Sequence, residues 1–285
     1  MIGRSLLLRR NVDDEAEGAT GPTGFNELLA IEELDRNLYR AVNDRNPERS
    51  HLYGGQVAAQ ALLATGLTVP EGRHPHSVHG YFLRPGMIER PILLHVERDR
   101  DGHSFSTRHV VAVQDGSVIF DMTASFHIDE EGGEHGPPLP DGVTPPEAME
   151  RSWYNRFFTA IDLCAFPTGL PPFSRIGMGS RLWTRIAEPL PDDRLLHACG
   201  VLYLSDLGTG FAAYELEGVP RGGPSLDHAL WFQRPIRADE WILIDLVPVK
   251  TGGGRGLYTG TMHARDGRLG ATLAQEILAR PAPPT

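Results

Sequence analysis

The second half of this chain repeats the first, and this repeat restricts the possible folds more than any other feature of the sequence. Three pairs of segments match at an offset of 150 or 151 residues: 81–85 with 231–235, 92–96 with 242–246, and 115–116 with 266–267. The first pair reads YFLRP and WFQRP, and the last pair is Asp-Gly in both halves. A period this long indicates one structural unit made twice.

Each repeat has the pattern of a helix followed by an antiparallel sheet. The helical stretches are 54–65 in the first half and about 197–214 in the second. Each is followed by an aromatic strand ending in Arg-Pro, a second apolar strand, a Gly-rich turn, a third strand, an Asp-Gly hairpin turn and a fourth strand. A helix that buries its apolar stripe against such a sheet gives an α+β architecture.

A segment rich in Gly, Pro and acidic residues divides the two repeats. It covers residues 129–150 and cannot form a regular element for long, so we interpret it as a linker. The predicted units are therefore an N-terminal repeat, 24–128, and a C-terminal repeat, 151–285. We interpret residues 1–23 as a mobile tail, because their apolar run is too short for a signal peptide.

Composition excludes several classes of protein for the 285 residues. The net charge of −10 and the lack of a basic run with interleaved aromatic residues argue against nucleic-acid binding. No apolar stretch approaches the roughly 20 residues of a membrane helix, so no membrane association is expected. The two cysteines cannot form a disulfide framework or a zinc site, which fits a cytoplasmic location.

The fourth strands of the two repeats differ on one face, where alternate residues lie side by side. The two rows are Val118, Phe120, Met122, Ala124 and Phe126 in the first repeat, and Leu269, Ala271, Leu273, Gln275 and Ile277 in the second. Gln275 interrupts an apolar face where its counterpart is Ala124. A buried amide without partners costs about 1–3 kcal/mol, so Gln275 is either a site residue or a core glutamine bonded to the backbone.

Other polar residues of the second repeat can be interpreted in two ways, as site residues or as structural residues. Along a strand beginning at Ser225, alternation places Ser225 and Asp227 on one face and His228 on the other. These are either site residues or turn and capping residues. Asp206 lies among leucines at the predicted helix and is either a helix cap or a site residue.

Several motifs together resemble those of the type II acyl-CoA thioesterase family, the double hot-dog thioesterases. They are GGQV at 54–57, QAL at 60–62, YFLRPG at 81–86, SLDH at 225–228 leading to Trp231-Phe232, and AQE at 274–276. The resemblance spans about residues 25–280. It implies two repeats, each a long helix wrapped by an antiparallel sheet, with the sheets joined side by side. It also implies an acyl-CoA hydrolase of fatty acid and lipid metabolism.

The resemblance further implies that three residues hold the attacking water: Asp206, Ser225 and Gln275. A carboxylate can accept the proton of water, while a hydroxyl and an amide can fix its orientation. Because no G-x-S-x-G motif presents a serine nucleophile, we expect direct hydrolysis without an acyl-enzyme. Asp227 is the reserve catalytic candidate. We expect no cofactor and no metal.

Substrate contacts are predicted from charge and from helix starts. Backbone N–H groups near Gly54 and Gly55, or in the stretch 198–200, are candidates for stabilising an oxyanion. An acidic protein needs local arginines to bind polyanionic CoA, and the candidates are Arg84, Arg108, Arg234 and Arg255. The family resemblance implies a homo-oligomer, a dimer or a tetramer.

Three rival readings remain. His74, His76 and His79 suggest a metal site, but on a strand His79 would point away from the other two. The segment 44–47 (DRNP) is similar to the D-x-N-P start of hot-dog enoyl-CoA hydratases, although Glu48 and Arg49 stand where those enzymes have an apolar residue and His. A non-catalytic acyl-CoA-binding module is the third reading, since fold alone does not establish activity.

Overall fold

The computed structural model describes residues 24–166, 180–211 and 223–280. In these ranges the chain forms one antiparallel sheet of twelve strands, ordered β1-β2-β4-β5-β6-β3-β9-β12-β11-β10-β8-β7. The strands of the first half are β1 (Glu32–Asp35), β2 (Leu38–Ala41), β3 (Arg73–Phe82), β4 (Ile92–Asp101), β5 (Phe105–Gln114) and β6 (Ser117–Ile128). Those of the second half are β7 (Ile161–Ala165), β8 (Arg181–Ile186), β9 (Asp227–Phe232), β10 (Ile242–Gly252), β11 (Arg255–Ala264) and β12 (Leu269–Leu278). This confirms the predicted α+β class with a large antiparallel sheet.

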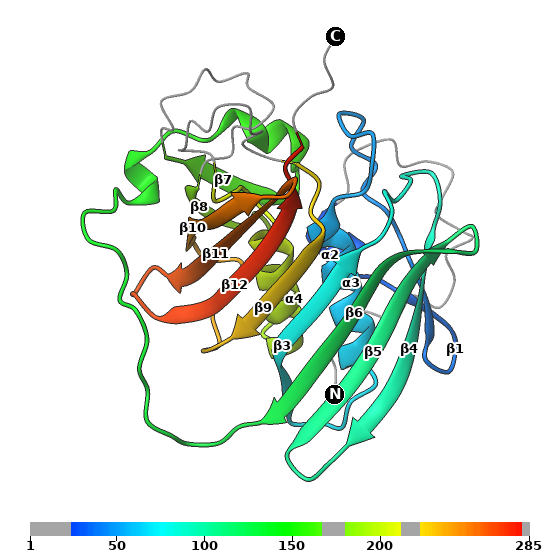
Figure 1. Cartoon of the computed structure of the whole chain (residues 1–285). Helices are drawn as coiled ribbons and strands as arrows, with labels where there is room; N and C mark the ends of the chain where they lie inside the picture. The colour runs from blue at the N-terminus through cyan, green and yellow to red at the C-terminus, as the bar shows by residue number, and fades with distance from the viewer. Residues whose placement is uncertain (1–23, 167–179, 212–222, 281–285) are drawn as a thin grey trace.

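The two halves of the sheet have the same strand arrangement and meet at one pair of strands. The order β4-β5-β6-β3 of the first half matches β10-β11-β12-β9 of the second. β3 pairs antiparallel with β9, with Val78 opposite Leu230, so the sheet is continuous (Figure 1). Asp115 and Gly116 have the positive φ values, 46° and 72°, that a tight hairpin requires. The Asp-Gly turn between β5 and β6 was therefore correctly predicted.

Two central helices, α3 (Gly54–Gly66) and α4 (Arg194–Ser205), lie behind the strands (Figure 1). α3 packs against β3, β4, β5 and β6, and α4 packs against β3, β8 and β9. The helices contact each other and run antiparallel. A Cβ built on Gly55 would lie 2.5 Å from the Tyr203 carbonyl oxygen, and one on Gly66 would lie 2.5 Å from Leu195. The end of each helix therefore lies beside the start of the other.

The predicted helix boundaries are right for α3 and shifted for α4. α4 begins at Arg194, before the predicted start, because the Asp193 carboxylate accepts the Leu195 and Leu196 N–H groups and caps the helix. It ends at Ser205, and Tyr214, the predicted end, lies outside the described residues. The other helical segments in the described ranges are short: α2 (Phe25–Leu28) and the 3-10 turns η1 (Pro146–Ala148) and η2 (Trp153–Phe157).

The acidic, Pro-rich segment 129–150 crosses from the first half to the second with little regular structure, only η1. Trp183 Nε1 donates to the Thr144 carbonyl at 2.9 Å. Leu139 and Val143 pack against the small buried cluster that contains Trp183. The segment is therefore fixed to the sheet of the second half.

No helix in the described parts of the chain is long and apolar enough to cross a membrane.

Candidate active site

Asp206, Ser225 and Gln275, which sequence analysis selected separately, lie within hydrogen-bonding distance of one another. Gln275 Nε2 donates to Asp206 Oδ1 at 3.1 Å and to Ser225 Oγ at 2.5 Å. Ser225 Oγ lies 3.4 Å from Asp206 Oδ1. The three come from the end of α4, the approach to β9, and β12. An acid, a hydroxyl and an amide thus converge on one point.

The start of α3 forms the other wall of this site. Gly55 N–H donates to Asp206 Oδ2 at 2.8 Å. A Cβ on Gly54 would lie 2.7 Å from that same oxygen and 2.8 Å from the Phe82 ring, so this close approach requires glycine. Asp206 is the C-cap of α4, where a negative charge is unfavourable, but the positive end of the α3 dipole faces it. Of the two oxyanion candidates, only Gly54 and Gly55 lie at a helix start, because 198–200 lie inside α4.

His228 also belongs to this cluster, and sequence analysis placed it on the wrong face. Its Nδ1 hydrogen-bonds Gln275 Oε1, and its Nε2 lies 2.7 Å from Ser205 Oγ. The imidazole therefore holds the amide oxygen of Gln275 and leaves the amide N–H groups turned toward Asp206. The signal was present in the repeat, because the residue 150 positions earlier is Val78.

The error arose because the predicted strand starts too early. β9 begins at Asp227, and Ser225 makes only an isolated bridge to Ile277. Strict alternation does not hold across that break, so Ser225 and His228 both reach Gln275. Asp227 Oδ1 instead accepts the backbone N–H of Glu276 at 2.7 Å, which explains why the reserve candidate is absent from the cluster.

The Asp206 carboxyl is buried, and burial raises its pKa above the ordinary value of an aspartate. His228, Gln275, the Gly55 N–H and Ser225 act in the opposite direction, since each favours the charged form. Burial also lowers the pKa of His228, against the effect of the nearby Asp206 charge. An aspartate with a raised pKa is a stronger base than an exposed one once it is ionised.

The four candidate arginines do not lie together. Arg84 follows β3 and donates to the Val118 carbonyl at 2.6 Å. Arg255, at the start of β11, bonds Glu276 at 2.9 Å. Arg234 pairs with Glu134, which belongs to the segment that joins the halves.

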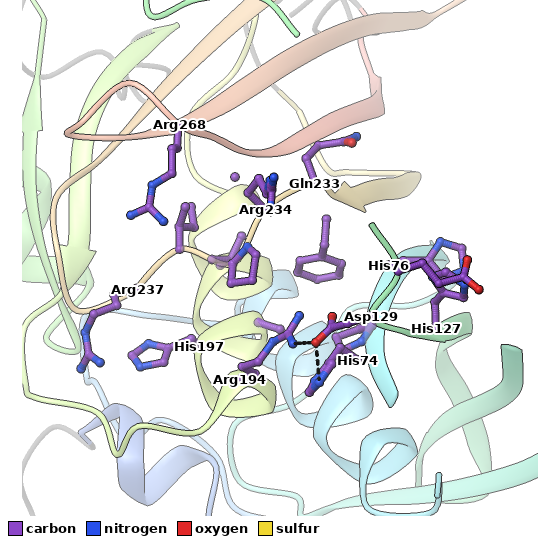
Figure 2. A pocket seen from close by; sticks show the side chains of 18 of the residues that line it. His74, His76, His127, Asp129, Arg194, His197, Gln233, Arg234, Arg237 and Arg268 are labelled. Atoms are coloured by element: carbon purple, nitrogen blue, oxygen red, sulfur yellow. Dashed lines mark hydrogen bonds and ion pairs between the residues drawn. The ribbon is translucent and has the colours of Figure 1, made fainter. Parts of the chain in front are cut away.

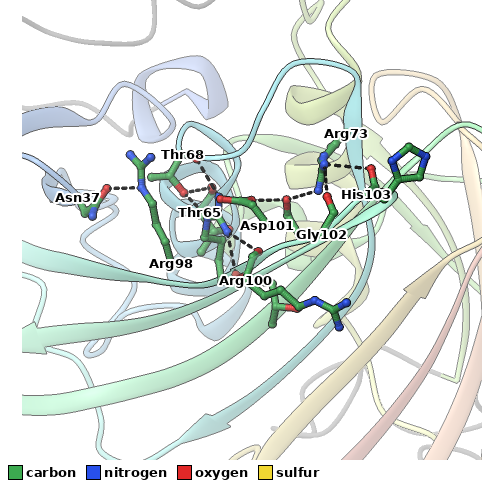
Figure 3. Close-up of polar contacts among 12 residues, drawn as sticks. Asn37, Thr65, Thr68, Arg73, Arg98, Arg100, Asp101, Gly102 and His103 are labelled. Carbon is green, nitrogen blue, oxygen red and sulfur yellow. Dashed lines mark hydrogen bonds and ion pairs between the residues drawn. The ribbon is translucent and has the colours of Figure 1, made fainter.

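Arg108 is a structural residue, and the prediction that it contacts CoA is not retained. Its side chain is 0% exposed. Its guanidinium donates to Thr68 Oγ1 at 2.8 Å, to the Asp101 carboxylate at 2.8 and 3.0 Å, and to the carbonyls of Thr68, Arg100 and Thr107. Figure 3 shows this network around Thr68 and Asp101. A guanidinium with its donors satisfied and no solvent access cannot bind a phosphate.

The residues of the rival readings have structural contacts of their own. His76 Nε2 lies 2.8 Å from Ser125 Oγ, while the His79 ring packs edge-on against Trp231. Among the described residues no three His, Cys, Asp or Glu side chains are grouped as a metal site requires. Asp44 is buried and accepts the Asn46 N–H at 3.1 Å, as in a local turn.

Comparison with known families gives two adjoining matches. Residues 42–127 match the model of the acyl-CoA thioesterase N-terminal domain, and residues 137–279 match that of the acyl-CoA thioesterase C-terminal domain. Each of the two repeats thus matches a different thioesterase domain model.

Individual proteins are similar over nearly the whole chain. Acyl-coenzyme A thioesterase 8 of Rattus norvegicus is 34% identical, with 90% of this chain and 88% of that protein covered. Acyl-CoA thioesterase 2 of Haemophilus influenzae is 32% identical, with 89% and 96% covered. The solved acyl-CoA thioesterase II TesB2 of Mycobacterium marinum is 38% identical with a TM-score of 0.75, over 92% of this chain and 98% of that chain. A hot-dog protein from Alicyclobacillus acidocaldarius, 20% identical with a TM-score of 0.71 over 91% and 98%, shares the fold.

Proposed function

This chain belongs to the acyl-CoA thioesterase family and is a thioester hydrolase, and we propose that it converts acyl-CoA to free acid and CoA by direct attack of water. The observation that carries this mechanism is the convergence of Asp206, Ser225 and Gln275 on one buried point. The site lies in the second half and faces the start of α3 from the first. Both halves therefore build one catalytic site.

In the proposed reaction, Asp206 accepts a proton as water attacks the thioester carbonyl carbon. Ser225 and Gln275 orient that water through their hydroxyl and amide groups. The negative charge that develops on the carbonyl oxygen is stabilised at the N-terminus of α3, whose backbone N–H groups and positive dipole end face the site. Collapse of the tetrahedral intermediate breaks the C–S bond, and Asp206 returns the proton to the CoA sulfur.

Ser225 is not the nucleophile in this proposal. Its hydroxyl is bonded by the Gln275 amide and faces the Asp206 carboxylate. The nearby histidine, His228, is turned to the amide oxygen of Gln275 and to Ser205. Among the described residues no imidazole contacts the Ser225 hydroxyl, so the serine–histidine pair of the common serine hydrolases is not formed here.

We also propose the finer architecture, a double hot-dog in which 24–128 and 151–285 are the two repeats and 129–150 is the linker. The matching strand orders of the two half-sheets, with one central helix behind each, support it. Arg84 is the preferred contact for a CoA phosphate, because it follows Phe82, whose ring lies against Gly54. We further propose that the chain forms a homo-oligomer and acts in the cytoplasm on lipid substrates.

The proposed function is tested by measuring thiol release from short, medium, long and hydroxylated acyl-CoAs, beside hydration of crotonyl-CoA. Thiol release without hydration is the expected result. Hydration without thiol release would favour the hydratase reading, and tight binding of acyl-CoA with neither reaction would favour a binding module.

Replacing Gln275 with Leu is expected to lower kcat about 100-fold, since the amide both orients water and donates to the Asp206 carboxylate. His228→Phe should reproduce part of that loss, because the amide is then free to rotate. Steady-state kinetics on both variants measure this. Unchanged kcat in Gln275→Leu would remove the amide from the mechanism.

The pH dependence follows from the raised pKa of Asp206. The base must be ionised, so kcat/KM is expected to fall as the pH drops through a pKa above the ordinary aspartate value of about 3.9. Gln275→Leu should shift this limb to higher pH, because one donor to the charged form is lost. If kcat/KM fell at the same pH in the wild type and in Gln275→Leu, a group other than Asp206 would control the pH dependence.

A further inference from the structure

A large pocket lies at the start of α4, at the opposite end of the central helices from the candidate active site. Its volume is about 1060 Å³. Four arginines and two histidines of its lining are His74, Arg194, His197, Arg234, Arg237 and Arg268 (Figure 2). Six carboxylates line it as well: Asp129, Glu130, Glu131, Glu134, Asp192 and Glu240. Val201, Phe232 and Ile236 add apolar surface to the same pocket. Its size is that of a small-molecule site, and its largely charged lining suits a polar ligand.

The internal repeat relates this pocket to the candidate active site. The active site lies at the start of α3, the approach to β9 and the end of β12, and the pocket lies at the start of α4, the start of β3 and the end of β6. The residues equivalent to Ser225, His228 and Gln275 are Pro75, Val78 and Ala124. The pocket therefore keeps the position of an active site and lacks the groups that would hold water.

This pocket has cationic side chains at positions where the equivalent residues of the first repeat are neutral. The offsets of 150 and 151 place Arg237 and Arg268 at positions occupied by Met87 and Ser117 in the first half. Arg194 is the first residue of α4, whereas α3 starts with Gly54. Only Arg234 has an arginine, Arg84, as its counterpart. Three of these four arginines are thus specific to the pocket.

Carboxylates from the segment 129–134 pair with some of these cationic side chains. Asp129 Oδ2 lies 2.6 Å from Arg194 and 3.9 Å from His74 Nε2. Glu134 pairs with Arg234. The side chains of Arg194 and Asp129 are 40% and 72% exposed, so the pair contributes little stability and can exchange for another anion. Arg237 pairs with Asp239 and Glu240 of its own loop and with Asp192, and Arg268 pairs with Asp266.

His197 adds an independent indication of a ligand. Its side chain is 8% exposed, and its Nδ1 accepts the Ala238 N–H at 3.2 Å. The proton of the neutral ring is then on Nε2, which has no hydrogen-bond partner among the described residues. A buried donor without a partner is rare in proteins, and here it belongs to the pocket lining.

We propose that this pocket is a second, non-catalytic site that binds a phosphorylated nucleotide, the chemical class to which the adenosine end of CoA belongs. Arg194 and Arg234 bind its phosphates after displacing Asp129 and Glu134, since a guanidinium fork suits phosphate oxygens. Phe232 and Ile236 offer the apolar surface for the base. The two acids of the linker act as built-in competitors of the ligand.

The test is binding of adenosine 3′,5′-bisphosphate to the full chain by isothermal titration calorimetry. Arg194→Ala and Arg234→Ala are each expected to weaken binding at this site about tenfold, while Asp129→Asn with Glu134→Gln strengthens it. Arg84→Ala, the equivalent change in the other cleft, is the matched control and should leave this site unaffected. Thiol release from acyl-CoA, measured on Arg194→Ala, should stay near the wild-type rate, and urea denaturation of both pocket variants shows whether they fold.

Three results would overturn the proposal. The first is no binding by either the wild type or the Asp129→Asn, Glu134→Gln variant. The second is binding that both pocket variants retain at full strength. The third is a single site that Arg84→Ala removes, which would place the nucleotide in the catalytic cleft. Because thiol release is measured separately, loss of hydrolysis would count against the catalytic mechanism and not against this site.

Discussion

Replacing Asp206 with Asn is expected to lower kcat for acyl-CoA hydrolysis about 1000-fold while KM changes little. General-base catalysis contributes about 100- to 10,000-fold, and the amide of asparagine cannot accept the proton of water. Its oxygen can still take the Gly55 N–H that Oδ2 now accepts, so the start of α3 should keep its place. The loss should therefore appear in kcat, as expected for a group that acts mainly in the transition state.

Asp227→Asn is the matched control, because Asp227 is the reserve candidate for the base and lies two residues from Ser225. The amide introduced by this change would retain an oxygen for the Glu276 N–H that Asp227 Oδ1 accepts at 2.7 Å. Steady-state kinetics on both variants should show a large loss for Asp206→Asn alone. The reverse pattern would make Asp227 the base.

Replacing Arg108 with Ala is expected to lower the free energy of unfolding by about 2–5 kcal/mol, the range for truncating a large buried side chain to Ala. Asp101 is 42% exposed, so the carboxylate left behind adds little to this loss. The change removes the donors to Thr68 and Asp101 and leaves a cavity between β5 and the end of α3. Urea denaturation should show a lower midpoint with an unchanged slope.

Arg98→Ala is the control for this stability effect. Arg98 is exposed and donates to Asn37 Oδ1 at 2.9 Å (Figure 3). Its removal should change the free energy of unfolding by less than about 0.5 kcal/mol. If Arg108→Ala instead kept full stability and raised KM for acyl-CoA, the predicted phosphate contact would be restored.

The sequence predicted the fold class well because the deciding patterns are local. Helix and strand periodicities, and the Asp115-Gly116 turn with its positive φ values, depend on neighbouring residues. The repeat then supplied a comparison within the chain, through which Gln275 differs from Ala124. The assignment of Asp206 and Ser225 came from family resemblance, and the structure brings both next to Gln275.

Contacts between distant segments could not be predicted in this way. The hydrogen bond from Gly55 to Asp206 joins residues 151 positions apart through the packing of α3 on α4. His228 was placed on the wrong face because alternation fails at the irregular start of β9. Arg108 had a usable signal, since it is in phase with the buried Val110 and Ala112 along β5. A charged residue in an apolar row indicates an internal partner more than a ligand.

Direct attack of water is the central claim, and rapid-quench kinetics combined with intact-mass measurement of the protein tests it most directly. The wild-type chain is mixed with excess acyl-CoA, and CoA, free acid and protein mass are followed through the first turnover. The account predicts that CoA and acid appear together, without a burst of CoA, and that the protein mass is unchanged. A burst of CoA with one acyl group added to Ser225 or Asp206 would contradict it.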